Sequence, residues 1–561
     1  MMAKRKIAKK YGIGIIENSE ILRYINSGPT AIGAVGPLAS LRKILRKRAV
    51  RTMSGVAPVA VLTKPYPCPG KCAYCPTEKD VPQSYLSNEP AVMRAIRCGY
   101  DPYKQTQSRL RALEANGHKP TKIEIIVIGG TWSALPEEYK YWYIKECFRG
   151  ANDYGGKNQK SKSKNQNDNV KFKIDKIKNK LLFEQKRNEK AKYKIIGLTL
   201  ETRPDYINEK ELLEMRELGC TRVELGVQAV DDGILKKNRR GHGVREIADA
   251  TKLLRDFGFK ITYHIMPGLP GATPAKDLKM FKQLFVPLDK LKSITLREND
   301  KNKDKKLKKF VKADYPTGFS DERFQPDQIK FYPTVVTRGS LLYRWWRAGK
   351  YKPYSDKVLR KLIVECKKAV PEYVRVIRLI RDIPGESIVA GNRITNLRQV
   401  MRQKGVECGC IRCRECRDEA LPRLYGANLK LRIIKYQASG GEEYFIQAQS
   451  KDGKTLYGFC RLRLPNSAQK GAKPLRFAAA NRSGLAPSSA IIRELHVYGE
   501  LVSVGDEKVV QHSGLGKKLM REAEKIAKIN GYEKIAVISG VGARDYYRKL
   551  GYRLKNSYMV K

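Results

Sequence analysis

The stretch of sequence that decides the fold is Lys64-Pro-Tyr-Pro-Cys68-Pro-Gly-Lys-Cys72-Ala-Tyr-Cys75-Pro76. It directly follows an apolar β-type run and spaces three cysteines as Cys-x3-Cys-x2-Cys. Three thiolates on one loop are one ligand short of a closed tetrahedral zinc site. A 4Fe-4S cluster held by three cysteines instead leaves one iron open, and that iron can chelate the amino and carboxylate groups of S-adenosylmethionine (SAM). We therefore expect an iron–sulfur loop here, with SAM as its ligand.

Apolar β-type runs alternate with helical periodicity from Val56 onward. Helices are expected at Glu211–Leu218 and Arg245–Phe257, between runs that have the composition of strands. About six β/α units in series favour a parallel sheet curled into a partial or full barrel, an α/β fold whose chemistry lies after the carboxyl ends of the strands. The expected strands are Val56–Leu62, Ile123–Ile128, Ile195–Leu200, Arg222–Val227, Lys260–Ile265 and Ile329–Val336.

Polar residues follow several of these strands, and we expect them to line the mouth of the barrel. They are Glu201, Thr202, Arg203, Gln228 and His264. Ordinary hydrogen bonding within loops is the alternative role for each of them.

Three segments interrupt the globular pattern. Residues 1–55 carry basic clusters, and Leu41–Val50 within them predicts an amphipathic basic helix that contacts RNA. Gly155–Lys194 is rich in Lys, Asn, Gln and Ser without a clear period, so we expect a surface insertion that is largely mobile. Asn299–Lys312 is a similar charged patch in a later connection.

A second group of cysteines lies between two α/β regions. Cys408, Cys410, Cys413 and Cys416 offer four thiolates within nine residues. Such a set suits one tetrahedral metal better than two disulfides, so we expect structural zinc, with a second iron–sulfur cluster as the alternative. We expect this segment to fix the relative orientation of the two regions.

Residues 421–561 return to a globular composition and predict a second α/β domain. Strands are expected at Leu429–Tyr436, Tyr444–Gln449, Ile491–Tyr498 and Ile535–Ser539, and helices at Gly514–Ile529 and Ala543–Leu550. Gln511-His-Ser-Gly514-Leu-Gly516 precedes the first of these helices, where backbone N–H groups can bind a pyrophosphate. This loop, the strand after it and Tyr546-Tyr547-Arg-Lys-Leu-Gly551 occur in an order similar to that of the GNAT acetyltransferases, which bind acetyl-CoA.

The chain has 112 Lys and Arg against 57 Asp and Glu, a formal charge of +55. Such a surplus favours a polyanionic partner, nucleic acid first, and adaptation to a salty or hot cytoplasm is the alternative. Clustered cysteines that bind metals are typical of reducing compartments, and the sequence has no run of 18 apolar residues. We therefore expect a cytoplasmic protein with no membrane attachment.

A radical SAM segment and a GNAT segment in one chain resemble the catalytic subunit of Elongator and its stand-alone archaeal and bacterial relatives. Matching stretches include Glu89-Pro-Ala-Val-Met-Arg-Ala-Ile-Arg97, Glu201-Thr-Arg-Pro-Asp205 and Arg493-Glu-Leu-His-Val-Tyr-Gly499. The family's pattern implies a basic tRNA-binding segment at 1–55, a radical SAM domain at 56–395, a cysteine-rich zinc linker at 396–420 and a GNAT domain at 421–561. The Lys-rich insertion and the compact first cysteine group depart from the pattern, but neither removes a chemical group.

The resemblance also implies ligands. It places a 4Fe-4S cluster on Cys68, Cys72 and Cys75, and it makes Gly129 and Gly130 the glycine pair that receives the SAM amino group. It implies acetyl-CoA contacts at Lys122, Glu494, Leu495, His496, Val497, Leu515, Gly516, Lys517 and Tyr547, which Gln511 and Gly514 join through the pyrophosphate loop.

The implied reaction makes 5-carboxymethyluridine at the wobble position of tRNA. A 5′-deoxyadenosyl radical would take hydrogen from the acetyl methyl of acetyl-CoA, and the carbon radical would add to carbon five of uracil. Lys122 would reach the acyl group from the radical side, and His496 or Tyr547 would orient water or the thioester. The implied partners are the tRNA anticodon stem-loop and an electron donor protein or reductant, and a homodimer stays open.

Two other functions are left open by the residues. A protein lysine acetyltransferase with a structural Fe-S domain would acetylate lysine whether or not SAM and the cluster are present. A non-catalytic tRNA-binding scaffold would bind RNA without turnover, and the intact first cysteine group and Gln511 loop weigh against it.

Overall fold

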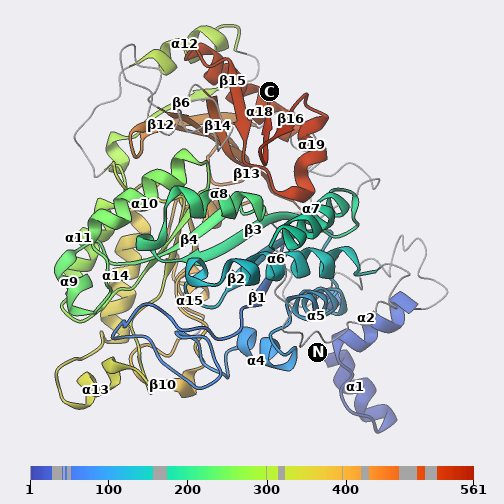
Figure 1. Ribbon diagram of the computed structural model, residues 1–561, viewed down its shortest axis with the longest axis vertical. Helices are drawn as coiled ribbons and strands as arrows, with labels where there is room; N and C mark the ends of the chain where they lie inside the picture. Colours follow the sequence, from blue (N-terminus) through green and yellow to red (C-terminus); the bar gives the residue numbers. More distant parts are fainter. Residues whose placement is uncertain are drawn as a thin grey trace.

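Seven strands form the sheet of the first domain (Figure 1). The computed structural model describes residues 2–27, 41, 44–46, 52, 54–155, 174–297, 300–313, 322–394, 396–417, 429–465, 489–499 and 514–561. All neighbouring strands are parallel. In sheet order they are β1 (Ala57–Leu62), β2 (Lys122–Ile128), β3 (Lys194–Thr202), β4 (Arg222–Gln228), β5 (Lys260–Ile265), β7 (Gln328–Phe331) and β9 (Arg375–Arg378).

The sheet confirms the predicted partial barrel, because β1 and β9 are the edges of its described strands. The first five expected strands coincide with β1 to β5 within two residues at either end. The sixth expected run is divided: β7 joins the barrel, whereas β8 (Val336–Thr337) pairs with β10 (Ile388–Ala390) in a separate antiparallel ladder. All seven residues of β4 are buried, as parallel sheets covered on both faces require.

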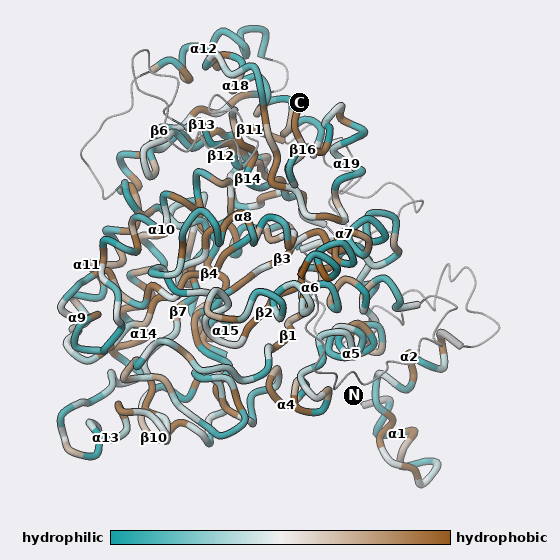
Figure 2. The backbone as a smooth tube through the Cα atoms, in the orientation of Figure 1, coloured by the Kyte–Doolittle hydropathy of each residue, from teal (hydrophilic) through white to brown (hydrophobic). Residues whose placement is uncertain are grey.

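Helices cover the outside of the barrel, and Figure 2 shows hydrophobic strands inside and hydrophilic stretches along the outer helices. The N-caps of several helices are side chains that accept a backbone N–H, as Asp101 does from Lys104. The helices of this domain and of the linker are α4 (Pro90–Arg97), α5 (Pro102–Ala115), α6 (Glu137–Asn152), α8 (Glu209–Glu217), α9 (Asp232–Lys237), α10 (Val244–Asp256), α11 (Pro274–Gln283), α13 (Leu341–Arg347), α14 (Asp356–Lys368), α15 (Leu397–Gln403) and α16 (Ile411–Arg414).

The expectation of a largely mobile insertion at Gly155–Lys194 is wrong for its second half. Residues 174–190 form helix α7 (Ile174–Lys190), which packs beside α6. Ile177 and Leu181 are buried at an i, i+4 spacing, and Asn152 of α6 donates to the carboxylate of Glu184 at 2.7 Å. The two apolar positions lie among many lysines, so the helical period is weak in the sequence.

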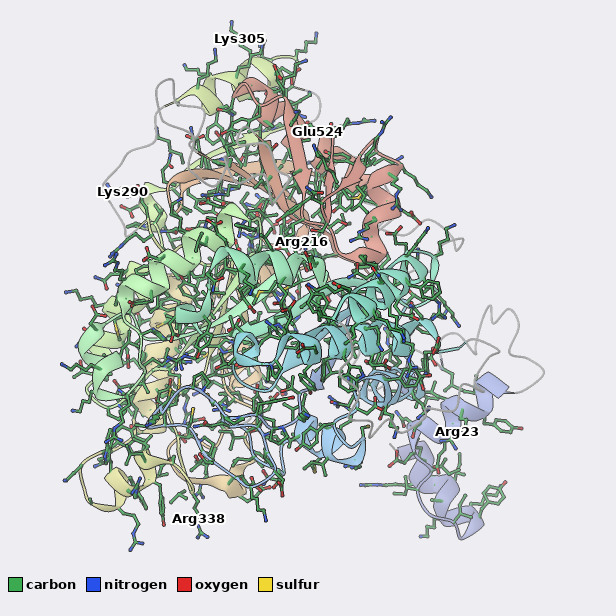
Figure 3. The ribbon with its side chains drawn as sticks, in the orientation of Figure 1. Arg23, Arg216, Lys290, Lys305, Arg338 and Glu524 are labelled. Carbon is green, nitrogen blue, oxygen red and sulfur yellow. The ribbon has the colours of Figure 1, made fainter. Side chains whose placement is uncertain are left out.

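Two helices precede the barrel, the basic α1 (Met2–Tyr11) and the amphipathic α2 (Asn18–Ser27). Figure 3 labels Arg23 on α2, away from the body of the barrel. The helix expected at Leu41–Val50 lies largely outside the described residues. No helix in the described part of the chain is both long and apolar enough to span a lipid bilayer.

The second domain is built on an eight-stranded sheet of mixed direction. Its strands in sheet order are β16 (Arg553–Lys555), β17 (Tyr558–Val560), β15 (Lys534–Val537), β14 (Ser489–Val497), β13 (Leu456–Pro465), β12 (Gly441–Gln449), β11 (Lys430–Gln437) and β6 (Lys292–Leu296). Helix α18 (Leu515–Ile529) packs on β12, β13 and β14, and α19 (Arg544–Arg548) follows β15.

Strand β6 and helix α12 (Lys303–Lys312) are part of the second domain, although they precede β7 of the first domain in the chain. β6 pairs with β11, and α12 lies beside α18 (Figure 1). Lys303 of α12 binds Glu522 of α18 at 2.6 Å, and Lys525 of α18 binds Asp304 at 3.1 Å. The charged patch predicted for Asn299–Lys312 is therefore a helix across its residues 303–312.

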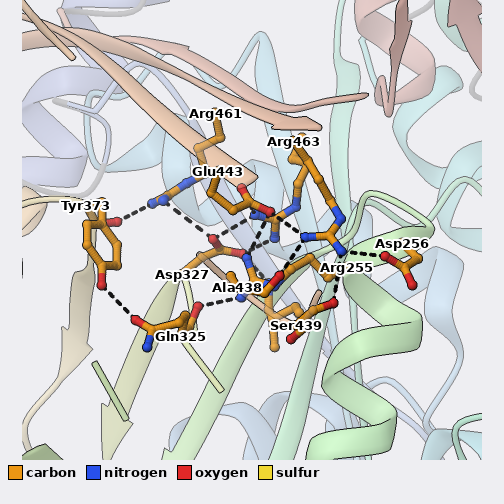
Figure 4. Close-up of polar contacts among 12 residues, drawn as sticks. Arg255, Asp256, Gln325, Asp327, Tyr373, Ala438, Ser439, Glu443, Arg461 and Arg463 are labelled. Atoms are coloured by element: carbon orange, nitrogen blue, oxygen red, sulfur yellow. Dashed lines mark hydrogen bonds and ion pairs between the residues drawn. The ribbon is translucent and has the colours of Figure 1, made fainter. Parts of the chain in front are cut away.

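The second domain packs against the amino ends of the barrel strands. Asp327, one residue before β7, is buried between Arg493 of β14 at 2.5 Å and Arg461 of β13 at 3.4 Å (Figure 4). Arg255 of α10 binds Glu443 of β12 at 3.1 Å in the same network. Elsewhere in the interface Arg216, labelled in Figure 3, donates to the Ser557 carbonyl. These charge pairs are almost fully buried, so the two domains form one body.

Candidate active sites

A cavity of about 470 Å³ opens at the carboxyl ends of the barrel strands. All five polar residues expected at the mouth line it: Glu201, Thr202, Arg203, Gln228 and His264. The first cysteine group and Gly130 line it as well. The cavity extends inward as far as Arg222, the first residue of β4, so it reaches from the mouth to the amino end of that strand.

Cys72 is the most activated thiol of the first cysteine group. Its pKa is lowered to about 5, chiefly by a hydrogen bond with Cys75, which outweighs burial, and further by the Arg240 guanidinium. Arg240 Nη1 donates to Cys72 Sγ at 3.3 Å. Cys68 Sγ lies 3.9 Å from Thr131 Oγ1. Since thiolates are the ligands of iron, this loop is poised to bind a metal.

The loop geometry fits a cluster better than a single ion. Among the described residues, the three sulfurs of this group do not all lie within 4.8 Å of one another, unlike the set at Cys408–Cys413. Each cysteine of a 4Fe-4S cluster binds a different iron, which requires more widely spaced sulfurs. Two buried donors that face the cavity, Arg203 Nη1 and Arg240 Nε, have no partner within the described chain and suit an anionic or polar ligand.

The glycine pair has a conformation that only glycine adopts readily. Gly129 and Gly130 have φ values of +137° and +99°. A Cβ added to Gly129 would lie 2.1 Å from Thr63 Oγ1, and that hydroxyl has no hydrogen-bond partner in the described chain. Glycine at position 129 thus allows the backbone to pack closely against Thr63 beside the first cysteine group, and the SAM subsite stays a prediction.

A buried polar network, which the sequence did not reveal, fills the wall of the barrel between its two ends. Glu224 of β4 accepts from His264 at 2.9 Å and pairs with Lys330 of β7. Burial opposes ionisation of Glu224, but Lys330 and His264 hold its pKa well below the ordinary value. Below it Arg222 binds Glu124 at 3.1 Å. Side chains alternate between the two faces of a strand, so the sequence can place these residues on the inner face of the sheet. Which of them pair with one another is shown only by the folded structure.

Lys122 is the first residue of β2, at the amino end of the sheet and outside the residues that line the cavity. The first cysteine group follows the carboxyl end of β1, so Lys122 and that group lie at opposite ends of the sheet, and its predicted role toward the acyl group stays a prediction. Burial lowers the pKa of Lys122. The second domain meets this same end: His496 Nε2 donates to the Ser54 carbonyl at 2.9 Å, and Lys260 Nζ lies 3.7 Å from Glu494.

The acetyl-CoA residues expected on β14 lie at a divergence of two strands. β14 pairs with β15 only from Ser489 to Ile492, so Glu494, Leu495, His496 and Val497 continue without that partner. Such a gap exposes backbone groups for a ligand. Leu515, Gly516 and Lys517 begin α18 next to it, and Gly514 caps the helix with φ +82°. Gln511 lies outside the described residues.

Two tyrosines of α19 face this cleft differently. Tyr547 is buried, and burial raises its pKa far above the ordinary value. Tyr546 is 37% exposed, and its hydroxyl lies 2.6 Å from the position of a Cβ added to Gly516. The sequence singled out Tyr547, whereas the hydroxyl at the start of α18 belongs to Tyr546. Burial also lowers the pKa of His496, so its ring is neutral at pH 7.

The second cysteine group brings three of its four sulfurs close together. The Sγ atoms of Cys408, Cys410 and Cys413 all lie within 4.8 Å of one another. The backbone N–H of Cys416 donates to the Leu456 carbonyl of β13 at 2.9 Å. Zn–S bonds of about 2.3 Å in a tetrahedron require sulfurs about 3.8 Å apart, and three thiolates within 4.8 Å of one another are compatible with one ion.

The fold and the two sites define a radical SAM enzyme that also carries an acetyltransferase domain. Residues 66–284 match the radical SAM superfamily, 326–405 the radical SAM C-terminal domain and 412–552 the GNAT acetyltransferase family. The tRNA uridine(34) acetyltransferase of Dehalococcoides mccartyi is 40% identical over 92% of this chain and 99% of its own length. Human Elongator complex protein 3 is 36% identical over 100% of this chain and 92% of its own length.

A solved structure agrees with these sequence relatives. The archaeal Elp3 of Methanocaldococcus infernus, with an N-terminal deletion, superposes with a TM-score of 0.67 at 36% identity, over 90% of this chain and 99% of that one. The chain therefore belongs to the tRNA uridine(34) acetyltransferase family, which includes Elongator complex protein 3.

Proposed function

We propose that this protein converts the wobble uridine of tRNA to 5-carboxymethyluridine with acetyl-CoA and radical SAM chemistry. One observation carries the proposal: a single cavity runs inside the barrel from the first cysteine group to Arg222. Arg222 is in register with Lys260, which contacts Glu494 at the acetyl-CoA cleft. The proposed radical site and acetyl donor site would therefore lie at the two ends of one barrel, which suits a reaction that needs both.

The cofactors would be held by residues already described. Cys68, Cys72 and Cys75 would bind a 4Fe-4S cluster, with Gly129 and Gly130 at the SAM amino group. The cluster and SAM supply a 5′-deoxyadenosyl radical. Acetyl-CoA would lie along Glu494–Val497, with its pyrophosphate at the backbone N–H groups that begin α18.

Side chains at the amino end of the barrel would handle the thioester. His496 is neutral and is oriented by its hydrogen bond to the Ser54 carbonyl, so its other ring nitrogen is an acceptor able to orient water. Lys122, with its lowered pKa, would face the acyl group from the same end of the sheet. Tyr547 is protonated at neutral pH and would donate a hydrogen bond.

The second cysteine group would hold zinc as a structural ion between the domains. Cys413 is the favoured thiolate because hydrogen bonds from Cys408 and Cys410 lower its pKa. Cys408, Cys410 and Cys413 would supply three ligands, and Cys416 would be the fourth. Metal analysis of the purified protein and of a Cys410→Ser variant tests this: the variant should lose one equivalent of zinc without losing iron.

The anticodon stem-loop would be the RNA substrate, with the target base turned out of its stack. The formal charge of +55 supports binding through phosphates. A reductant or electron donor protein in the cytoplasm would deliver the electron that SAM cleavage requires. A homodimer stays open.

The test is anaerobic incubation of reconstituted protein with tRNA, SAM and acetyl-CoA, followed by digestion and mass spectrometry of the nucleosides. We expect 5-carboxymethyluridine from the wild type and none from Cys72→Ala. Lysine acetylation that continues without SAM, in the absence of modified uridine, would favour a protein acetyltransferase. RNA binding with neither product would favour a scaffold.

A further inference from the structure

A second large cavity, of about 800 Å³, lies beside the second cysteine group. It is bounded by α15, α16, the start of β11 and the turn between β12 and β13. Of the 20 described residues that line it, nine are Lys or Arg and three are Asp or Glu. We call this cavity the basic groove. No residue of the proposed radical or acetyl-CoA sites lines it.

Several cations of the basic groove form no ion pair within the described chain, although Lys454 lies near enough to Asp452 to lower the pKa of that carboxylate. The side chains of Arg402, Lys451 and Lys454 make no hydrogen bond or ion pair with any other residue in the described chain, and all three are exposed. By contrast Arg414 is buried and is saturated by Gln447, Gln449 and two backbone carbonyls, so it holds the wall in place. The open cations can therefore accept an external anion.

Two further guanidiniums of the groove have buried N–H groups without a partner. Arg398 Nη1 and Arg432 Nε are inaccessible to solvent and make no hydrogen bond within the described chain. Arg432 shares Glu372 with Arg414, at 3.4 Å and 3.7 Å. One carboxylate between two guanidiniums leaves a surplus of positive charge, which an arriving anion would neutralise.

The position of the groove excludes the phosphates of CoA as its occupant. Its lining comes from β6, β11 and β12, whereas the acetyl-CoA cleft lies between β14 and β15, across β13 in the same sheet. On its other side the groove is next to the radical site. Arg398 donates to the Val376 carbonyl of β9 at 2.7 Å, and the next residue, Ile377, lines the barrel cavity.

We propose that the basic groove binds the phosphodiester backbone of the RNA substrate and holds it while one base enters the barrel. The inference rests on the proposed function for the identity of the RNA. Long flexible cations on an exposed turn suit a polyanion that crosses the groove, because each of them binds a phosphate and not a base. The groove then contributes affinity to all tRNAs alike and little sequence preference.

The experiment compares tRNA binding by the full chain and by the triple variant Arg402→Gln, Lys451→Gln, Lys454→Gln. These side chains are exposed, so the variant should fold, which thermal unfolding verifies. We expect the Kd for tRNA to rise about tenfold or more at physiological salt. The slope of log K against log salt should become shallower by about 2 to 3, close to one for each phosphate that the variant no longer binds.

The matched control removes the same charge elsewhere, through Lys528→Gln, Lys534→Gln and Lys555→Gln, which are exposed on the second domain and outside the groove. It should bind tRNA like the wild type, and the KM for acetyl-CoA should be unchanged in both variants. Equal loss of affinity in both triples, or a changed KM in place of weaker tRNA binding, would overturn the groove proposal alone. A wild type that does not bind tRNA would overturn the proposed function with it.

Discussion

Arg240 is the residue whose role could be learned only from the fold. It lies 168 residues after Cys72, yet its guanidinium donates to that sulfur and to the Gly226 carbonyl. The cysteine spacing itself predicted the metal loop, because three thiolates on one loop are local in sequence. The basic partner of that loop is not local, so no spacing could indicate it.

Substitution Arg240→Gln should make the bound cluster harder to reduce, because hydrogen bonds to the ligand sulfurs raise the reduction potential. We expect at least a tenfold lower ratio of reduced to oxidised cluster at a fixed potential, a shift of about 59 mV to more negative values. An EPR-monitored redox titration measures it. Arg239→Gln is the control, because Arg239 is exposed beside it. Equal potentials in all three proteins would contradict this role for Arg240.

Among the elements, the barrel strands were predicted and one strand of the second sheet was missed. β1 to β5 are short segments rich in β-branched and other apolar residues, as buried parallel strands are. β13 was missed although it lies inside the second sheet, because Arg461 and Arg463 interrupt its apolar residues. Both arginines are buried and paired with acidic groups of other elements, which a sequence pattern cannot show.

Helix α7 offers a comparison of two neighbouring leucines. Leu181 is 1% exposed and Leu182 is 58% exposed. If α7 is a packed part of the barrel wall, Leu181→Ala should lower the free energy of unfolding by about 2–5 kcal/mol, whereas Leu182→Ala should change it by less than about 0.5 kcal/mol. Chemical denaturation of both variants measures the difference. Similar small effects would show that α7 does not contribute to the core.

At the scale of the whole molecule, the long-range connections could not be foreseen. β6 and α12 leave the first domain to complete the sheet of the second, and β11, their partner, lies more than a hundred residues later. Sequence patterns indicate that a strand forms but not which strand it pairs with. The same holds for the docking of the second domain on the amino ends of the barrel, where Arg493 and Arg461 meet Asp327.

Asp327 should make the joined domains sensitive to acid. Burial alone would raise its pKa, but Arg493, Arg461 and Arg255 hold the pKa well below the ordinary value. The native pKa is thus lower than the unfolded one of about 3.9, so this contribution to stability is complete at neutral pH and is lost as the pH falls below about 4.

Asp327→Asn should remove that contribution. We expect a loss of about 3–5 kcal/mol at pH 7, because the arginines stay buried without their partner, and a smaller fall in stability on acidification than in the wild type. Denaturation at pH 7 and at about pH 2.5, below the unfolded pKa, measures both. The exposed Asp289→Asn is the control, since its side chain is 73% exposed. Parallel curves for Asp327→Asn and Asp289→Asn would contradict the role of the network.

The central claim is that the two domains act on one acetyl group, and acetyl-CoA deuterated in the acetyl methyl tests it most directly. The protein is incubated anaerobically with this donor, tRNA and SAM, and the nucleosides and 5′-deoxyadenosine are analysed by mass spectrometry. The account predicts one deuterium in 5′-deoxyadenosine and two in the carboxymethyl group of the modified uridine. Unlabelled 5′-deoxyadenosine together with label found only on lysine would contradict it.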